Sequence, residues 1–210
     1  MSDEHRAEHP GRQLQVSDLL LSIAEAWTAR GAGESAFRAP VVLIDGRSGS
    51  GKTDLANLLA SAWGTQVTVV HLDDIYPGWG GLDEASTHIH DHLLTSTTPS
   101  WQRYDWISEQ RTEWVSVDPY LPLIVEGIGS LSRANSGLAT LSVWLELDEV
   151  TRRTRVLARD GKTFASHWES WAVQETAFIN REQPQQLADI VLNSPGHQRN
   201  SSVNSAPLEP

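Results

Sequence analysis

A run of eight residues, GRSGSGKT at positions 46–53, has the residue types and spacing needed to hold phosphate groups. It fits the pattern G-x-x-x-x-G-K-[ST]. The glycines let consecutive backbone N–H groups curve around phosphate oxygens, the lysine supplies a movable cation, and the threonine hydroxyl suits Mg²⁺. We therefore expect ATP with Mg²⁺, and we assign the contacts to Gly46, Ser48, Gly49, Ser50, Gly51, Lys52 and Thr53.

Such a loop must lie between a strand and a helix, and the flanking sequence predicts both. The apolar run 41–45 precedes the loop, and a helical pattern begins near Thr53. Further strand-like runs lie at 67–71, 123–126, 141–147 and 190–192, and helical patterns cover 14–30 and begin near Asp83, Asp148 and Phe164. This alternation predicts an α/β fold, with a parallel sheet covered by helices on both faces.

The bulk composition limits the class of protein. A length of 210 residues suits one domain, which we place at 13–193, and the polar ends at 1–12 and 194–210 are predicted to be disordered. The net charge of −11 argues against nucleic acid or membrane partners, so a phosphate ligand must be held by local geometry. The sequence has no cysteine, no secretory signal and no long apolar stretch, so we expect a cytoplasmic protein.

Two acidic residues follow the second predicted strand, in the run HLDDIYPGW. Ligands of open parallel sheets bind beyond the carboxyl ends of the strands, so Asp73 and Asp74 should lie at the same edge as the phosphate loop. A carboxylate there can accept the proton that an alcohol loses when it attacks phosphorus. The two acids therefore favour a hydroxyl acceptor; the alternative is that they cap the next turn.

Other charged residues could stabilise a transferred phosphoryl group. Glu126 ends the apolar run LIVE, where a carboxylate can hold Mg²⁺ directly or through water; alternatively, it bonds loop backbone. Arg152, Arg155 and Arg159 share one face of a predicted helix, at i, i+3 and i+7. We interpret them as part of a lid over the phosphates, the alternative being a solvated face paired with nearby acids.

A triphosphate site alone does not specify a reaction. The chain lacks the Asn-Lys-x-Asp motif of switch GTPases and the Leu-Ser-Gly-Gly-Gln signature of transporter ATPases. Phosphoryl transfer to a small acceptor and regulatory ATP binding both remain open. A nucleoside monophosphate kinase is a third hypothesis, in which Arg103 and Arg111 would bind the acceptor phosphate, but an acid at Asp73 would then be hard to explain.

The motifs GRSGSGKT, LDDIYPG, RYDW and IVEGI, followed by the arginine helix, occur in an order that resembles the uridine kinase-like branch of the P-loop kinases. This branch includes uridine kinases, phosphoribulokinases and pantothenate kinases, and the resemblance covers residues 40–182. It implies a P-loop three-layer sandwich with a five-stranded parallel sheet of order 2-3-1-4-5 and a helical lid at about 150–182. It also implies transfer of the ATP γ-phosphate to a hydroxyl group.

The resemblance also implies roles for individual residues. Asp73, which precedes x-x-Tyr, matches the catalytic base, and Glu126 matches the acid near Mg²⁺. Arg152 and Arg155 match lid arginines that act in catalysis together with Lys52. The acceptor side would include Tyr76, Tyr104, Asp105 and Trp106. The run PGWGGLDEAS departs from the uridine kinase pattern and we identify no base-reading histidine, so the acceptor stays open.

The sequence also contains a pair of histidines, an irregular segment and several tryptophans whose roles can be predicted. His88 and His92 are spaced i, i+4, but no third metal ligand is evident, so we expect surface or pocket-lining histidines. Segment 99–122 has weak periodicity and is interpreted as irregular, with no more than one helix. Among the tryptophans we expect Trp79, Trp101 and Trp106 near the acceptor, Trp27, Trp63 and Trp144 in the core, and Trp168 and Trp171 in core or lid packing.

Overall fold

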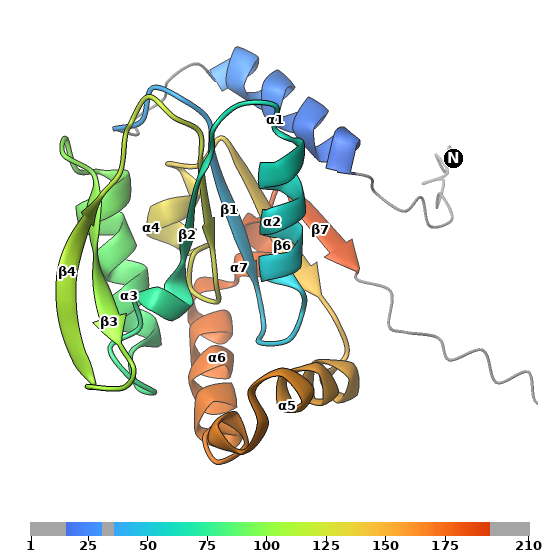
Figure 1. Cartoon of the computed structure of the whole chain (residues 1–210). Helices are drawn as coiled ribbons and strands as arrows, with labels where there is room; N and C mark the ends of the chain where they lie inside the picture. The colour runs from blue at the N-terminus through green and yellow to red at the C-terminus, as the bar shows by residue number, and fades with distance from the viewer. Residues whose placement is uncertain (1–15, 31–35, 194–210) are drawn as a thin grey trace, which may run out of the picture.

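A parallel sheet of five strands forms the centre of the protein, seen in a computed structural model that describes residues 16–30 and 36–193 (Figure 1). The strands are β1 (Val41–Gly46), β2 (Thr68–His71), β5 (Leu123–Glu126), β6 (Leu141–Glu146) and β7 (Ile190–Asn193). Their order is β2-β5-β1-β6-β7, and each neighbouring pair is parallel. Numbered along the chain within this sheet, the order is 2-3-1-4-5, which confirms the predicted topology.

Helices cover both faces of the sheet, because alternate residues of its buried strands point to opposite sides. Val42 and Ile44 of β1 pack in one apolar cluster with helices α1 and α2, whereas Val41 and Leu43 pack in another with α3 and α6. The predicted three-layer sandwich is therefore confirmed. The helices are α1 (Val16–Arg30), α2 (Lys52–Ala62), α3 (Leu82–His88), α4 (Arg133–Ser136), α5 (Glu149–Ala165), α6 (Trp168–Glu182) and α7 (Pro184–Leu187).

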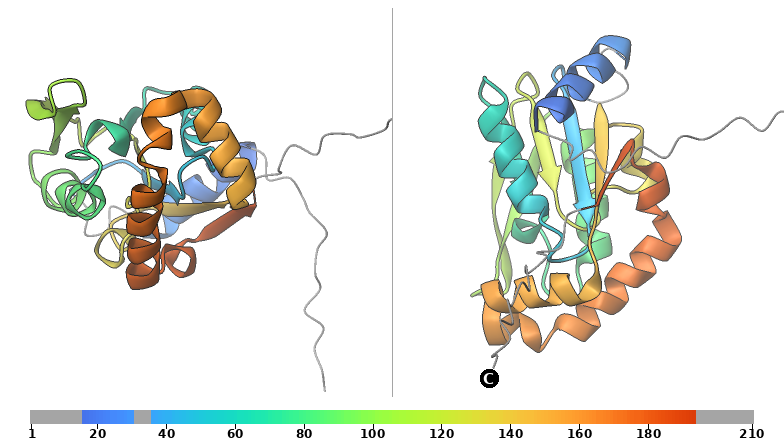
Figure 2. Two further views of the ribbon diagram at one scale, coloured as in Figure 1. Left: turned by 90° about the horizontal axis from the view of Figure 1, so that it is seen from below. Right: turned by 90° about the vertical axis from the view of Figure 1, so that its right-hand side faces the viewer.

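Helices α5 and α6 build the region predicted as the lid. Helix α5 lies across the end of the sheet beside the loop that follows β1, and α6 returns along the sheet toward β7 (Figures 1 and 2). The two are separated by a short turn, and α5 is itself kinked at Gly161, whose φ of 62° and ψ of −141° are not helical. This arrangement brings α5 against the phosphate loop.

The segment predicted to be irregular is instead an antiparallel hairpin, so that prediction was wrong. Strands β3 (Ser100–Asp105) and β4 (Gln110–Ser116) pair with each other and not with the central sheet. The alternation was hard to see because β4 is almost entirely exposed and Trp101 is the one fully buried residue of β3. The hairpin packs on a π-helical turn, η2 (Ile89–Leu94), and on a 3₁₀ turn, η1 (Leu72–Asp74).

The histidine pair anchors this hairpin. The Nε2 atom of His88 accepts a hydrogen bond of 3.1 Å from the backbone N–H of Gln102 in β3. The ring of His88 also stacks on Trp114 of β4, with His92 beside both. Within the described ranges, no group of three or more His, Cys, Asp or Glu residues could hold a metal ion. His88 is buried against the hairpin, which corrects the expectation of a surface or pocket-lining residue, whereas His92 is exposed as expected.

Tryptophans divide between core and surface in a way that corrects part of the prediction. Trp144 is fully buried as expected, whereas Trp27 and Trp63 are only half-buried. Trp101 is buried in the cluster with α3 and does not reach the acceptor side. The ends predicted to be disordered lie outside the described residues. Among the helices that the structure describes, none has the length and apolar composition needed to span a membrane.

Candidate active site

The phosphate loop is a tight turn between β1 and α2 that depends on glycine. Gly49 and Gly51 have φ values of 82° and 99°, in the left-handed region that side chains disfavour. A Cβ atom on Gly49 would also lie 2.5 Å from the carbonyl oxygen of Arg152. The Oγ atom of Ser50 is buried and has no hydrogen-bond partner in the described structure. Such a buried polar group in a glycine-rich cradle fits a phosphate-bearing ligand.

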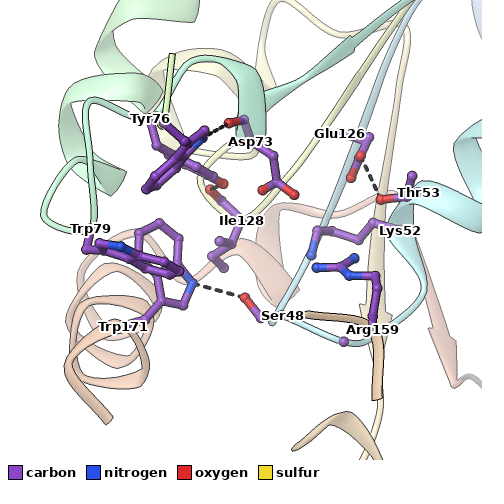
Figure 3. A pocket seen from close by; sticks show the side chains of 12 residues that line it. Ser48, Lys52, Thr53, Asp73, Tyr76, Trp79, Glu126, Ile128, Arg159 and Trp171 are labelled. Carbon is purple, nitrogen blue, oxygen red and sulfur yellow. Dashed lines mark hydrogen bonds between the residues drawn. The ribbon is translucent and has the colours of Figure 1, made fainter. Parts of the chain in front are cut away.

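Next to this loop lies a cavity of about 330 Å³, shown in Figure 3. A second, larger hollow of about 730 Å³ adjoins it and is lined by the loop and the start of α5. Gly49, Lys52, Thr53 and Arg159 line both spaces, so the two cavities lie side by side along the loop. The first cavity is lined by Ser48, Gly49, Lys52, Thr53, Asp73, Tyr76, Trp79, Trp106, Glu126, Ile128, Arg159 and Trp171.

Thr53 and Glu126 meet at the end of the phosphate loop. The Thr53 hydroxyl donates a hydrogen bond of 2.9 Å to Glu126 Oε1, and His71 Nδ1 lies 2.6 Å from the same oxygen. The parallel register brings His71 opposite Glu126. Burial opposes ionisation of Glu126, but the hydrogen bonds from His71 and Thr53 and the charge of Lys52 prevail and lower its pKa. The bond to Glu126 raises the pKa of His71.

This donor set fits Mg²⁺. Mg²⁺ prefers oxygen ligands, keeps several waters, and usually takes only one or two groups from the protein when it is bound with nucleotide phosphates. The Thr53 hydroxyl at the start of α2 and the ionised carboxylate of Glu126 at the end of β5 meet that requirement. Thr53 and Glu126 are therefore the residues that would hold the ion.

Asp73 and Asp74 lie side by side on η1 but face different surroundings. Asp73 is exposed and lines the cavity, whereas Asp74 does not line it and lies 3.8 Å from a guanidinium nitrogen of Arg103. The indole N–H of Trp106 donates a hydrogen bond of 2.8 Å to the backbone carbonyl oxygen of Asp73. The hairpin thus reaches across to fix the turn that carries Asp73.

Of the four residues predicted on the acceptor side besides Asp73, two line the cavity. Tyr76 is buried, and its hydroxyl donates a hydrogen bond of 2.7 Å to the carbonyl oxygen of Ile128. Trp106 forms part of the wall. Tyr104 does not line the cavity and makes an edge-on ring contact with Trp106. Asp105 instead accepts hydrogen bonds from Ile107 and Ser108 and holds the hairpin turn.

The three arginines predicted to belong to the lid lie in different surroundings. Arg152 is buried, and it donates hydrogen bonds to the carbonyl oxygens of Leu147 and Ser48, at 3.1 Å each, so it braces the phosphate loop from outside the cavity. Arg155 lines the larger hollow. Arg159 lines both spaces. Arg152 thus braces the loop, whereas Arg155 and Arg159 border the space beside it.

Helix α6 supplies contacts to the loop that sequence reasoning missed. Glu175 is buried and accepts hydrogen bonds from the Ser48 backbone N–H at 2.8 Å and from Arg47 Nε at 3.0 Å. Trp171 donates from its indole N–H to Ser48 Oγ at 3.0 Å, and its ring lines the cavity. An acid in the middle of a helix gives no sign in the sequence that it will be buried against a distant loop.

Asp45, the last residue before the loop, was also missed. It is fully buried and accepts hydrogen bonds from the backbone N–H groups of Gly46, Gly129 and Leu131. Burial raises its pKa to about 7, although these bonds and the charge of Lys52 oppose the shift. Its signal in the sequence was an acid at the end of an otherwise apolar strand. Asp45 ties the phosphate loop to the loop after β5.

A phosphate loop of this kind, in a sheet of this order, defines the fold of a P-loop kinase. No family model matches the sequence, and no curated protein matches it. Among solved structures, a protein from Bacillus stearothermophilus described as a possible uridine kinase is similar, with 21% identity, a TM-score of 0.51, and coverage of 83% of this chain and 99% of that chain.

A second similar structure is a protein from Silicibacter sp. TM1040 that is provisionally described as a fructose transport system kinase. Its identity is 18% and its TM-score 0.53, and the match covers 85% of this chain and 99% of that chain. These likenesses establish a fold shared with uridine kinase-like P-loop kinases, as the motifs predicted.

Proposed function

We propose that the protein is an ATP- and Mg²⁺-dependent kinase that transfers the γ-phosphate to a hydroxyl group of a small molecule. The observation that carries this proposal is a single cavity lined by both Lys52 of the phosphate loop and the exposed carboxylate of Asp73. A protein that only sensed ATP would need the loop but no acid facing it. The pairing of the two favours a phosphotransferase with an alcohol acceptor.

In the proposed reaction, the acceptor hydroxyl oxygen forms a bond to the γ-phosphorus while the bond from that phosphorus to the bridging oxygen of ADP breaks. Asp73 accepts the hydroxyl proton, which makes the oxygen a better nucleophile. Lys52 and Arg159 lie across the cavity, where they offset negative charge on the phosphoryl oxygens. Mg²⁺, when held by Thr53 and Glu126, would add positive charge at the β- and γ-phosphates.

The arginines have unequal parts in this proposal. Arg155 and Arg159 line the larger hollow, where the phosphates and the rest of ATP would lie. Arg152 acts through the loop, because both of its hydrogen bonds go to backbone carbonyl oxygens. We therefore assign Arg152 a positioning role, and Arg155 and Arg159 direct contact with phosphate.

A nucleoside monophosphate acceptor is less well supported. Arg103 is bound to Glu113, and Arg111 to Glu84, on the outside of the hairpin and α3. Neither arginine lines the cavity. The acceptor phosphate would therefore lack the cluster of cations that this reaction needs.

The direct test is ADP release from Mg-ATP in the presence of single nucleosides, sugars and vitamin alcohols. We expect at least one compound to raise the rate well above the acceptor-free rate. A parallel preparation of the Lys52→Ala variant controls for contaminating kinases. If ATP binds but no alcohol raises ADP release above this control, the site binds ATP for regulation and the proposal is wrong.

A further inference from the structure

Positive charge and aromatic rings occupy opposite ends of the cavity. Figure 3 shows Lys52 and Arg159 on one side of Asp73, and Tyr76, Trp79 and Trp171 on the other. Lys52 and Arg159 are the two cationic residues among the described residues that line this space. Both lie beside the phosphate loop, where the triphosphate of bound ATP would neutralise them. The described residues that line the other end include no lysine or arginine.

The aromatic end is a box of rings set at steep angles. Trp79 meets Trp106 at a centroid distance of 5.1 Å and 59°, and Trp171 at 6.2 Å and 86°. Tyr76 meets Trp171 at 4.9 Å and 72°. Rings packed edge to face leave their flat surfaces pointing in different directions, so several faces can border one guest.

Polar atoms of this box are already used by the protein. The indole N–H of Trp106 is bonded to the carbonyl oxygen of Asp73, that of Trp171 to Ser48 Oγ, and the Tyr76 hydroxyl to the carbonyl oxygen of Ile128. These three bonds fix the rings of Tyr76, Trp106 and Trp171, and one face of Trp79 is stacked on His167 at a centroid distance of 4.3 Å. The contact surface for a guest is therefore made by the ring surfaces that line the cavity. Such faces stack on flat rings and attract cations, because the ring quadrupole is negative over the face.

An anionic acceptor has little to hold it here. The Asp73 carboxylate and the π faces both repel negative charge. The two arginines of the hairpin, Arg103 and Arg111, are paired with Glu113 and Glu84 outside the cavity. The chain as a whole carries a net charge of −11, which adds to the unfavourable field.

Resting on the function proposed above, we propose that the acceptor is an alcohol carrying a flat ring without negative charge, and that a positively charged ring binds more tightly than a neutral ring of the same shape. The ring occupies the box of Tyr76, Trp79, Trp106 and Trp171, and the hydroxyl faces Asp73. Sugar phosphates and hydroxy acids are excluded as acceptors.

Three probes of similar shape test this: (hydroxymethyl)-N-methylpyridinium, (hydroxymethyl)toluene as the neutral ring, and (hydroxymethyl)benzoate. Their dissociation constants are measured by quenching of tryptophan fluorescence, with the protein saturated with Mg²⁺ and a non-hydrolysable ATP analogue. We expect the cation to bind about 5-fold or more tightly than the neutral ring, and the anion to bind weakest. Equal affinities, a preference for the anion, or no binding by any of the three would overturn the proposal.

Variants locate the binding in the box. Trp79→Leu and Trp106→Leu should each remove most of the preference for the cation, whereas Trp114→Leu, on the same hairpin but outside the cavity, should keep it. Trp106 and Trp114 are both partly exposed, so neither change should prevent folding. A preference that survives both box variants contradicts the assignment. Acceptor-dependent ADP release tests the kinase activity separately. If the three probes bind in the predicted order but none is phosphorylated, the proposed function is refuted and the proposed binding site still stands.

Discussion

The phosphate loop and the β3–β4 hairpin border the same cavity but are held in different ways. The loop follows a fully buried strand and is braced from below by Asp45 and from outside by Arg152 and Glu175. The hairpin is mostly exposed, and its polar links to the rest of the fold include those at His88 and Trp106. The phosphate end is therefore built into the core, whereas the acceptor end is carried by an appended element.

The two kinds of anchoring suit two different functions, phosphate chemistry at the loop and acceptor recognition at the hairpin. Phosphate chemistry needs donors fixed within tenths of an ångström, and a loop anchored to a buried sheet provides that. Recognition of the acceptor depends on side chains that can change without disturbing the sheet, because few core contacts cross to the hairpin. Substitutions in the phosphate loop should therefore weaken the binding of both ATP and the acceptor, whereas substitutions in the hairpin should weaken the binding of the acceptor alone.

The largest effect is expected from Lys52→Ala. The lysine borders both spaces, so its loss should weaken ATP binding and lower kcat/KM by about 10³-fold. Steady-state kinetics and calorimetric ATP titration measure the two effects, and the melting temperature checks the fold. Nearly full turnover with normal ATP affinity would show that the loop does not bind the transferred phosphate.

Gly49→Ala should follow, at about a 10²-fold loss of kcat/KM, because the added Cβ would collide with the carbonyl oxygen of Arg152 and displace the loop. Gly64→Ala is the matched control. Gly64 has a φ of 80°, close to the 82° of Gly49, but its Cβ would meet nothing within 4 Å. The control should cost about 1 kcal/mol of unfolding free energy and leave kinetics unchanged. Equal kinetic losses in both variants would trace the effect to backbone strain alone.

At the hairpin, Trp106→Phe keeps an aromatic ring but removes the N–H that bonds the carbonyl oxygen of Asp73. A lost hydrogen bond of about 1 kcal/mol should raise the acceptor KM about 5-fold and leave the ATP KM unchanged. Trp114→Phe provides the control on the same hairpin. A parallel rise in both KM values would contradict the separation of the two ends.

The smallest effect concerns the pH dependence of stability. Burial, with the nearby charges of His92 and Arg111, lowers the pKa of His88 to about 4 from 6.5. The unfolded chain therefore binds a proton at His88 more readily than the folded chain does, so this residue costs stability as pH falls from about 6.5 to about 4.

The His88→Gln variant should lose less stability than the parent between pH 7 and pH 5, as measured by urea unfolding midpoints. The parent protein should lose more unfolding free energy than His88→Gln over the same pH interval. His90→Gln serves as the control and should follow the parent. Identical slopes for His88→Gln and the parent would mean that the hairpin anchor does not depend on a neutral His88.

The sequence predicted those parts of the fold that depend on local patterns. The central sheet could be predicted from its apolar strands, from the loop motif and from the helix that follows this loop. The order of its strands matches the order implied by the resemblance. The hairpin was missed because Trp101 is its one buried residue, which leaves no alternating pattern to detect.

Site residues divide in the same way. Those that follow a strand or lie in the motif, such as Asp73 and Glu126, could be found because strand ends share one edge of a parallel sheet. Glu175 and Trp171 act on the loop from more than a hundred residues away, and His71 meets Glu126 only through strand register. Contacts of this kind depend on tertiary packing and leave no local pattern.

The central claim is that Asp73 is the general base of a kinase, and a comparison of Asp73→Asn with Asp74→Asn tests it most directly. The two residues are adjacent, but only Asp73 lines the cavity. We predict that Asp73→Asn lowers acceptor-dependent turnover by about 10²-fold or more with nearly unchanged ATP affinity, and that Asp74→Asn stays close to the parent. Equal turnover in Asp73→Asn and the parent, or a larger loss in Asp74→Asn, would contradict the account.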